Sequence, residues 1–304
     1  MDFMNSNISI YDYFLYSIMP WRTRLDTFLK IIQISKNPLQ IIRSMKKSKY
    51  PIKVILKNGQ IKLCEHPIIF HALINNCKNL EIKNETLILN EENIQFVDWQ
   101  TNGDIPGVFI MKEYDKIPVK HADVIDIGAN IGDTAIRFIQ NGANTVIGIE
   151  PVPKFCVSAK KNIVLNKMED KIKIINCLVG RENRTIRTKF KIDEEIGSSA
   201  LAIPDKYGEK IESKTLEHLI SLTNSPSKIL KLDCEGCEYD IILNTPIDTL
   251  KKFQYIFVEY HDGHKNLERK LTECGFSVKN NTQNIYHRKH TNSILYLGYL
   301  IATK

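Results

Sequence analysis

The stretch DVIDIGANIGDTAIRFIQNGANTVIGIE, residues 123–150, decides the fold. It predicts a short apolar strand, a glycine turn, a helix closed by Gly142 and a second apolar strand. The same alternation continues downstream, with strands predicted at 171–179, 228–234 and 255–261 and helices at 154–166, 215–222, 238–244 and 264–275. Short apolar strands that alternate with helices are typical of a parallel sheet covered on both faces.

The two ends of the chain extend this pattern. Residues 276–280 and 294–303 predict final strands with no helix between them, so an antiparallel closing strand is expected. The predicted fold class is therefore α/β, a doubly wound and mostly parallel sheet of seven strands, formed by residues 121–304. Residues 1–120 predict an N-terminal α+β extension, with helices over 9–48 broken at Pro20 and Pro38 and a hairpin turn at Asn58-Gly59.

The composition is that of an ordinary globular protein, with 43% hydrophobic and 25% charged residues in a chain of 304. No apolar run approaches the ~18–20 residues of a membrane span, and the N-terminus lacks the regions of a signal peptide. The seven cysteines are odd in number and scattered, which does not suggest a disulfide framework. These features predict a cytoplasmic protein.

The net charge of +7 is unevenly distributed. Residues 21–57 contain ten Lys or Arg and a single acid, Asp26. Such a segment can bind phosphates of a nucleic acid or of anionic lipids, or it can simply be a solvated helix face.

The glycine turn after the first strand predicts a ligand site. A turn between a strand and a helix lets a ligand approach the backbone at the helix N-terminus. The Gly-x-Gly-x-x-Gly fingerprint of dinucleotide sites is not matched, because the outer glycines are four apart with an asparagine between them. Asp126 suits a cationic ligand better than a pyrophosphate, and S-adenosylmethionine carries an ammonium and a sulfonium. The predicted cofactor residues of this loop are Asp126, Gly128, Asn130, Gly132 and Asp133.

The second strand ends at Glu150, followed by Pro151. A carboxylate at this position can accept hydrogen bonds from both ribose hydroxyls of a nucleoside. The fourth strand should deliver Asp233 to the same edge of the sheet, where the carboxyl ends of parallel strands line the ligand crevice. We therefore predict that Asp233 also lies beside the cofactor.

Cys234 and Cys237 form a Cys-x-x-Cys motif directly after Asp233. A zinc site needs four ligands, and the chain offers no second motif of this kind. A thioredoxin-like redox site is geometrically conceivable because the cysteines precede a helix, but it would leave the cofactor loop unexplained. We interpret the two cysteines as small apolar side chains packed against the sheet.

Three segments together resemble one known family. VIDIGANIGDTAIRFIQNGANTVIGIEPVP, LKLDCEGCEYDII and IFVEYH are similar to the FkbM-type family of S-adenosylmethionine-dependent methyltransferases, and NGDIPGVFIMKEY upstream is similar to archaeal-type members. The resemblance covers about residues 104–299. It implies a class I methyltransferase fold, which is Rossmann-like, and O-methylation, often of sugar or polyketide-type hydroxyls. Ser198 and Ser199 resemble the family's serine pair, so Ser199 is expected to contact the cofactor or the acceptor, and a flexible cap is the alternative interpretation of this loop.

Methyl transfer to a hydroxyl needs a base or a metal, because a protonated hydroxyl is a poor nucleophile. The candidate catalytic residues are Asp233, Glu235, Glu259 and His261, with His261 the natural base near neutral pH. The same four residues could instead ligate Mg²⁺. Glu238 and Asp240 are acids in the first turn of a helix, where the helix dipole favours them without any catalytic role.

The predicted function is thus O-methylation of a hydroxyl on a sugar, glycan or small metabolite. One alternative is an RNA-directed methyltransferase that uses the basic N-terminal segment, although LDCEG replaces the Asn/Asp-Pro-Pro expected for base nitrogens. A non-catalytic S-adenosylmethionine-binding module is a second alternative. Peripheral membrane contact through residues 9–48 is a further possibility.

Overall fold

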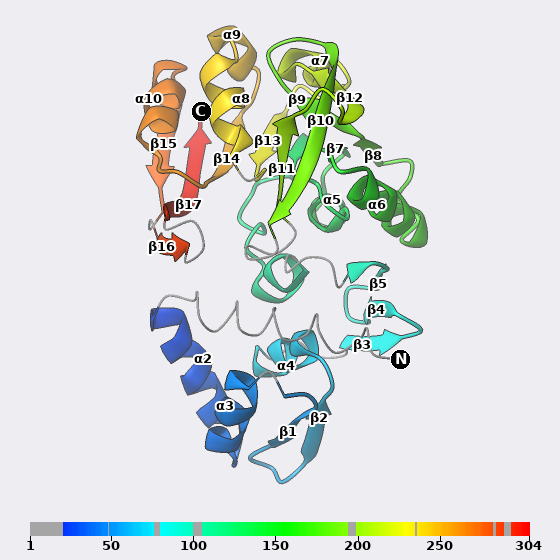
Figure 1. The fold of residues 1–304 in the computed structure, drawn as a ribbon, viewed down its shortest axis with the longest axis vertical. Coiled ribbons are helices and arrows are strands. Elements are labelled where there is room, and N and C mark those ends of the chain that lie inside the picture. Colours follow the sequence, from blue (N-terminus) through cyan, green and yellow to red (C-terminus); the bar gives the residue numbers. More distant parts are fainter. Residues whose placement is uncertain are drawn as a thin grey trace. The chain divides into compact units, whose positions relative to one another are not determined.

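The computed structural model describes residues 21–47, 49–75, 80–99, 105–193, 199–234, 236–281, 284–288 and 293–304. The chain divides into two compact units (Figure 1). Unit 1 comprises residues 1–112 and 194–198, and unit 2 comprises residues 113–193 and 199–304. The boundary thus falls at residue 112, within the segment that was predicted to form the N-terminal extension.

Unit 1 contains short helices and two small antiparallel sheets. Its elements are α2 (Trp21–Ile34), α3 (Pro38–Lys46), β1 (Ile52–Ile55), β2 (Ile61–Cys64), α4 (Pro67–Ile74), β3 (Leu80–Lys83), β4 (Thr86–Leu89), β5 (Ile94–Phe96) and the π-helix η2 (Pro106–Met111). Buried Ile31, Ile41, Ile52 and Phe70 lie in one core cluster that joins α2, α3, β1 and α4. This composition agrees with the predicted α+β extension.

Two local predictions for unit 1 are confirmed. Strands β1 and β2 pair antiparallel around the turn at Asn58-Gly59, where Gly59 has φ +89° and the Asn58 side chain accepts from the backbone N–H of Gln60. Glycine is favoured at such a positive φ because it has no Cβ. The helix break at Pro38 also occurs, since α3 begins there. Residues 9–20 of the predicted helical segment lie outside the described residues.

Unit 2 is built on the predicted doubly wound sheet. Its strands are β6 (Asp123–Ile127), β7 (Thr145–Ile149), β8 (Ile172–Ile175), β13 (Lys228–Leu232), β14 (Tyr255–Tyr260), β15 (Ser277–Asn280), β16 (Asn284–Arg288) and β17 (Ser293–Thr303). The order is β15-β17-β14-β13-β6-β7-β8, seven strands, with β16 paired to β17 off this path. All pairs from β14 to β8 are parallel, whereas β17 runs antiparallel to β14. The predicted antiparallel closing strand is therefore confirmed.

The central strand explains why this sheet forms. All five residues of β6 are buried, which a strand covered on both faces requires. The helices of unit 2 are α5 (Asp133–Gln140), α6 (Pro153–Leu165), α7 (Leu216–Ile220), α8 (Cys237–Asn244), α9 (Ile247–Leu250) and α10 (Lys265–Glu273). Helices α5 and α6 pack on each other and on β7 and β8, while α8 and α10 pack on each other and on β14 and β15.

The segment after the third strand differs from its prediction. It was expected as one strand over 171–179 followed by a polar insertion. The structure instead contains a second sheet in the order β11-β10-β12-β9, formed by β9 (Cys177–Val179), β10 (Arg184–Asp193), β11 (Ser199–Pro204) and β12 (Glu209–Lys214). The predicted strand is interrupted at Asn176, whose side-chain amide donates to the carbonyl oxygens of Glu150 and Pro151 at 2.9 Å each.

Candidate active site

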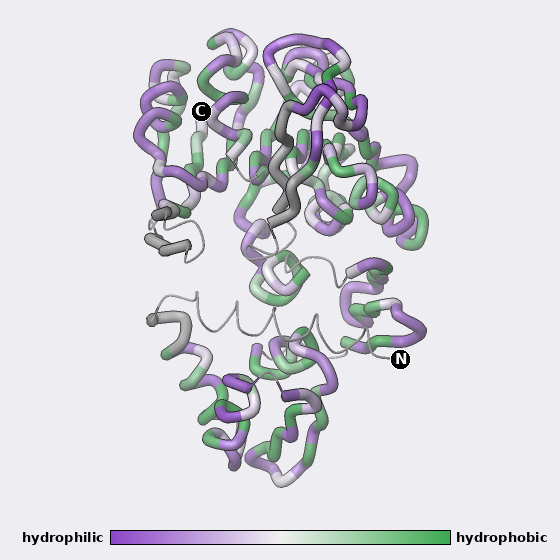
Figure 2. Tube along the Cα trace, viewed as in Figure 1, coloured by the Kyte–Doolittle hydropathy of each residue, from purple (hydrophilic) through white to green (hydrophobic). Residues whose placement is uncertain are grey.

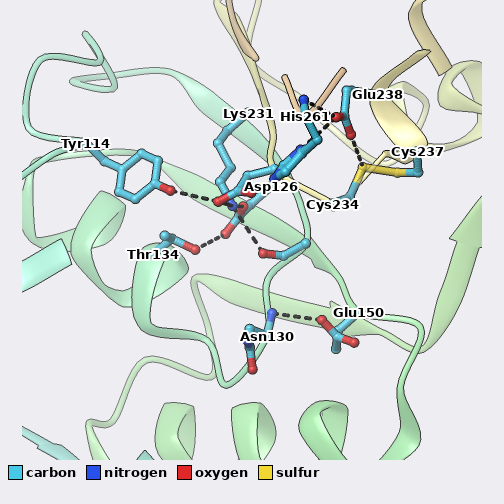
Figure 3. A network of polar contacts seen from close by, with 12 residues as sticks. Tyr114, Asp126, Asn130, Thr134, Glu150, Lys231, Cys234, Cys237, Glu238 and His261 are labelled. Atoms are coloured by element: carbon cyan, nitrogen blue, oxygen red, sulfur yellow. Dashed lines mark hydrogen bonds and ion pairs between the residues drawn. A yellow bond between two sulfur atoms is a disulfide. The ribbon is translucent and has the colours of Figure 1, made fainter. Parts of the chain in front are cut away.

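Four parallel strands bring the predicted site residues to one edge of the unit 2 sheet. Strand β6 lies between β13 and β7, and β14 lies next to β13. Their carboxyl ends therefore place the glycine turn, Glu150, Asp233 and His261 along the same edge. Figure 3 shows the polar network that these residues form.

The glycine turn at Gly128 contacts the acid-rich turn, which begins at Asp233 after β13 and leads into α8. Gly128 has φ +86°, and a Cβ on it would lie 1.8 Å from the carbonyl oxygen of Asp233. The backbone N–H of Asp233 donates to the carbonyl of Ile127 at 3.1 Å. Only glycine fits at this contact, because any larger residue would meet rigid backbone. Gly132, with φ +85°, caps the N-terminus of α5.

Glu150 closes the other side of the glycine turn. Its carboxylate accepts from the backbone N–H of Asn130 at 2.9 Å and from that of Val152 at 2.8 Å. Burial raises the pKa of Glu150 to about 7, and these two hydrogen bonds oppose the rise. The predicted neighbour Pro151 lies next to it and is partly exposed.

A buried lysine that was not predicted as a site residue organises the centre of the edge. Lys231 of β13 is 1% exposed, and its Nζ lies 3.1 Å from Asp126 Oδ1, 3.7 Å from Asp233 Oδ2 and 3.1 Å from the carbonyl oxygen of Gly128. Burial alone would lower the pKa of Lys231, but the two carboxylates outweigh burial and raise it. The lysine therefore stays charged and joins the glycine turn to the acid-rich turn.

Asp126 lies beneath the turn rather than at its surface. Its side chain is fully buried and accepts from the Thr134 hydroxyl at 2.5 Å in addition to its pair with Lys231. Burial raises the pKa of Asp126, and the charge of Lys231 and the Thr134 hydrogen bond oppose this. Lys231 supplies the cation that this buried carboxylate needs. The predicted direct contact of Asp126 with the cofactor stays a prediction. Asp133, also a predicted cofactor residue, is buried in the first turn of α5.

Asp233 occupies the predicted position at the end of β13, with its side chain 23% exposed. The Tyr114 hydroxyl donates to Asp233 Oδ2 at 2.8 Å. Burial alone would raise the pKa of Asp233, but the nearby charges of Lys231 and His261 and the Tyr114 hydrogen bond hold it below its ordinary value. The paired guanidinium of Arg137 and carboxylate of Asp115, 2.6 Å apart, tie the turn beside Tyr114 to α5.

Glu238 and His261 form a buried pair (Figure 3). Glu238 Oε1 lies 2.8 Å from His261 Nδ1 and accepts from the His261 backbone N–H at 3.2 Å, while Oε2 accepts from the N–H of Gly236 at 2.8 Å. Glu238 is fully buried and His261 is 7% exposed. Glu238 was expected only to favour the start of a helix, and the structure gives it a second role as the partner of the histidine. A carboxylate that accepts from Nδ1–H leaves Nε2 as the basic nitrogen of the neutral ring.

The two cysteines of the acid-rich turn are joined by a disulfide between Cys234 and Cys237. They pack, partly buried, against the core of unit 2, as predicted. The expectation that they are merely apolar side chains is wrong, because they are also bonded to each other. The Cys234 sulfur lies 3.6 Å from Glu238 Oε2 and has no proton to donate once it is oxidised, so this is a packing contact.

The predicted catalytic residues are brought together as far as they are described. One ligand atom each from Asp233, Glu259 and His261 lies within 4.8 Å of the others. Glu235, the fourth candidate, lies outside the described residues. Ser199 begins β11 in the second sheet, where it pairs with Asp193, and its contact with the cofactor stays a prediction.

A cavity of about 310 Å³ lies at the loop that follows β14. It is lined by residues 262–266, which follow His261, together with Tyr239, which follows Glu238, and Tyr296 of β17. The Tyr239 hydroxyl donates to the Gly263 carbonyl at 2.7 Å and accepts from the Asp262 N–H at 2.6 Å. These two hydrogen bonds fix the loop after β14 to α8.

Comparisons with known proteins agree with this architecture. The family model described as Methyltransferase FkbM domain matches residues 126–278, half of the chain. No curated protein shows significant similarity to the chain. No helix in the described residues is both long and apolar enough to cross a membrane.

Three solved structures illustrate the more distant similarity. The precorrin-6y C5,15-methyltransferase of Geobacter metallireducens GS-15 is 11% identical over 64% of this chain and 87% of its own, with a TM-score of 0.36. TrmK of M. capricolum, solved with S-adenosyl-homocysteine, is 14% identical over 64% and 68%, with a TM-score of 0.39. The magnesium protoporphyrin IX methyltransferase of Synechocystis PCC 6803, solved with bound SAM, is 12% identical over 66% and 77%, with a TM-score of 0.34.

The similarity of these three structures is too low to say anything about the reaction, and the assignment depends on the family model. That model begins at Asp126, on the first strand, and includes both the glycine turn and the acid-rich turn. The protein belongs to the FkbM family of S-adenosylmethionine-dependent methyltransferases.

Proposed function

We propose that the protein methylates a hydroxyl oxygen on a sugar, a glycan or a small polar metabolite, with His261 as the general base. The observation that carries the proposal is the 2.8 Å contact between buried Glu238 and His261 Nδ1, beside Asp233. A histidine held in this way presents Nε2 as a base of defined orientation.

The residues of the edge fit the parts of S-adenosylmethionine. Glu150 is the acid for the ribose hydroxyls, and the backbone turn of Gly128, Asn130 and Gly132 lies beside it. S-adenosylmethionine supplies an electrophilic methyl group. Lys231 forms ion pairs with both Asp126 and Asp233 and so connects the glycine turn to the acid-rich turn. In this arrangement Asp126 supports the cofactor site through Lys231 and Thr134.

The chemical step needs one proton acceptor. The acceptor oxygen forms a bond to the methyl carbon while the carbon–sulfur bond breaks, and S-adenosylhomocysteine leaves with the electron pair. The hydroxyl proton passes to His261 Nε2. Asp233, with its lowered pKa, is an anion near the histidine and stabilises the imidazolium that forms.

In this proposal the acceptor binds in the cavity formed by the loop that follows His261. Its lining combines two tyrosine rings with the carboxylate of Asp262, the amide of Asn266 and the ammonium of Lys265. Aromatic faces with convergent hydrogen-bonding groups suit a sugar ring, and the volume lies at the small end of the range for ligand sites.

The test uses labelled cofactor and extracts of cells that lack the protein, with the labelled product identified by mass spectrometry. His261→Ala and Glu238→Gln should lower kcat by about 10²–10⁴-fold, since a general base contributes that much. Both variants should bind S-adenosylmethionine by calorimetry as the unchanged protein does. Glu238→Gln should also displace the pH–rate profile, which a purely structural role would not do.

The matched control is His218→Ala, on α7 and outside the site, which should keep full activity. Asp233→Asn should abolish turnover and retain cofactor binding. Full activity in both His261→Ala and Asp233→Asn would overturn the assigned roles.

A metal-dependent route is the second candidate, because Asp233, Glu259 and His261 place three ligand atoms within 4.8 Å of one another. Mg²⁺ prefers oxygen ligands and would activate the hydroxyl directly. The charge of Lys231, 3.7 Å from Asp233, opposes a second cation there. Activity that a chelator abolishes and Mg²⁺ restores would favour this route over the histidine base.

The remaining predictions concern partners and location. An RNA acceptor stays the alternative to a sugar, and labelled RNA in the extract assay would identify it. A cytoplasmic location also stays a prediction. The Cys234–Cys237 disulfide is unusual for that compartment unless it is redox-active.

A further inference from the structure

Helix α2 carries an apolar face that unit 1 does not bury. The face consists of residues at positions i, i+3, i+4 and i+7, which lie on one side of a helix. Their exposed fractions are Leu25 46%, Phe28 36%, Leu29 47% and Ile32 37%, so four neighbouring apolar side chains share one partly exposed face. Along α2, apolar and polar residues alternate in Figure 2.

A different face of α2 packs into the unit. Thr27 and Ile31 are 7% and 1% exposed and lie four residues apart, and Ser35, directly after the helix, is 0% exposed. Packing therefore does not require the exposed stripe. The next helix continues the pattern, since Leu39 of α3 is 78% exposed.

The same segment is strongly basic. Residues 25–57 contain eight Lys or Arg and one acid, Asp26, which forms an i,i+4 pair with Lys30 at 2.7 Å. The other seven basic residues are exposed: Lys36, Arg43, Lys46, Lys47, Lys49, Lys53 and Lys57. An apolar stripe and an excess of exposed positive charge thus occur together on α2, α3 and the start of the following hairpin.

We propose that α2 and α3 dock the protein on the surface of an anionic lipid bilayer. Apolar side chains of an amphipathic helix bury in the interface while the lysines meet lipid phosphates, each worth about 1 kcal/mol near the surface. A second copy of the chain fits this face poorly, because two basic surfaces would repel each other. A nucleic acid would use the charges and leave the leucines in water.

The test uses the full chain and vesicles of phosphatidylcholine with one quarter phosphatidylglycerol. Co-sedimentation should occur with these vesicles, weaken at 0.5 M salt and be much lower with pure phosphatidylcholine.

The decisive variant is Leu25→Gln with Leu29→Gln, which keeps all charges and a good helix propensity. It should weaken vesicle binding at least about tenfold, because two partly exposed leucines no longer enter the interface. The matched control is Val157→Gln with Val164→Gln on α6, where the side chains are 53% and 58% exposed, and it should bind as the unchanged chain does.

Three outcomes would overturn the proposal. The first is equal vesicle binding by the leucine variant and the unchanged chain. The second is a stable dimer that the leucine variant alone dissociates, with no binding to vesicles. The third is salt-sensitive binding of RNA without binding of vesicles.

Discussion

The buried carboxylate of Glu150 should make the stability of unit 2 depend on pH. In the unfolded chain a glutamate loses its proton near pH 4.5, whereas burial raises the pKa of Glu150 in the folded protein to about 7. The folded state therefore holds the proton more tightly, and the free energy of unfolding falls as the pH rises from 4.5 to 7. The pKa of Glu150 differs by about 2.5 between the folded and unfolded states, so the free energy of unfolding falls by about 3 kcal/mol from acidic pH to pH 8. About 2.5 kcal/mol of this fall occurs between pH 5 and pH 8.

Glu150→Gln isolates this effect. The amide cannot accept from the N–H groups of both Asn130 and Val152, so the variant loses a hydrogen bond at every pH, at a cost of about 1–3 kcal/mol. That loss cancels when the same two proteins are compared at two pH values. The difference in unfolding free energy, wild type minus Glu150→Gln, should fall by about 2.5 kcal/mol from pH 5 to pH 8.

The assay is urea unfolding of both proteins at the two pH values, followed by fluorescence and circular dichroism. Glu209→Gln, at an exposed glutamate of β12, controls for the loss of one carboxylate from the chain. A wild-type-minus-Glu150→Gln difference that changes by less than about 0.5 kcal/mol between pH 5 and pH 8 would refute the reasoning, because the raised pKa would then be absent.

Three further predictions concern the same edge of the sheet. Lys231→Met should destabilise the protein by about 3–5 kcal/mol in urea unfolding, because it leaves buried Asp126 without its cation; an unchanged midpoint would contradict the pairing. Gly128→Ala should abolish cofactor binding in calorimetry, since its Cβ would overlap the Asp233 carbonyl, and binding at the normal affinity would show that the two turns separate easily. Reduction should expose two more thiols in the denatured protein and lower stability by about 2 kcal/mol, the entropy of so short a loop, whereas an unchanged thiol count would exclude the disulfide between Cys234 and Cys237.

The sheet was predictable because its strands are covered on both faces. Strands such as β6 and β13 are short apolar runs with helices between them, and this pattern leaves few alternatives. The second sheet was not predictable in the same way. Half of the residues of strand β10, RTIRTKFKID, are charged, so its composition indicates a polar insertion. Its pairing partners in β11 and β12 determine its structure more than its own composition does.

The candidate site was likewise predictable only in part, because some of its residues follow strands and others are brought in by long-range contacts. The glycine turn, Glu150 and Asp233 all follow strands, so their shared edge could be expected. Tyr114 donates to Asp233 although the two residues are 119 positions apart in the sequence, and no local pattern predicts such a contact. Lys231 is a cation between buried apolar residues of β13, which is a signal in the sequence, although its partners depend on which face of the sheet it occupies. The oxidation state of Cys234 and Cys237 depends on the surroundings of the chain as well as on its sequence.

The contact between Gly128 and the Asp233 carbonyl has a consequence for engineering. In the function proposed above, the glycine turn holds the methyl donor and the acid-rich turn faces the acceptor. Because Gly128 packs directly against the Asp233 carbonyl, a redesign of the acid-rich turn for a bulkier substrate would then also disturb the donor. Residues 262–266, after the neighbouring strand β14, line the cavity. Libraries aimed at new acceptors should therefore vary that loop and leave the acid-rich turn intact.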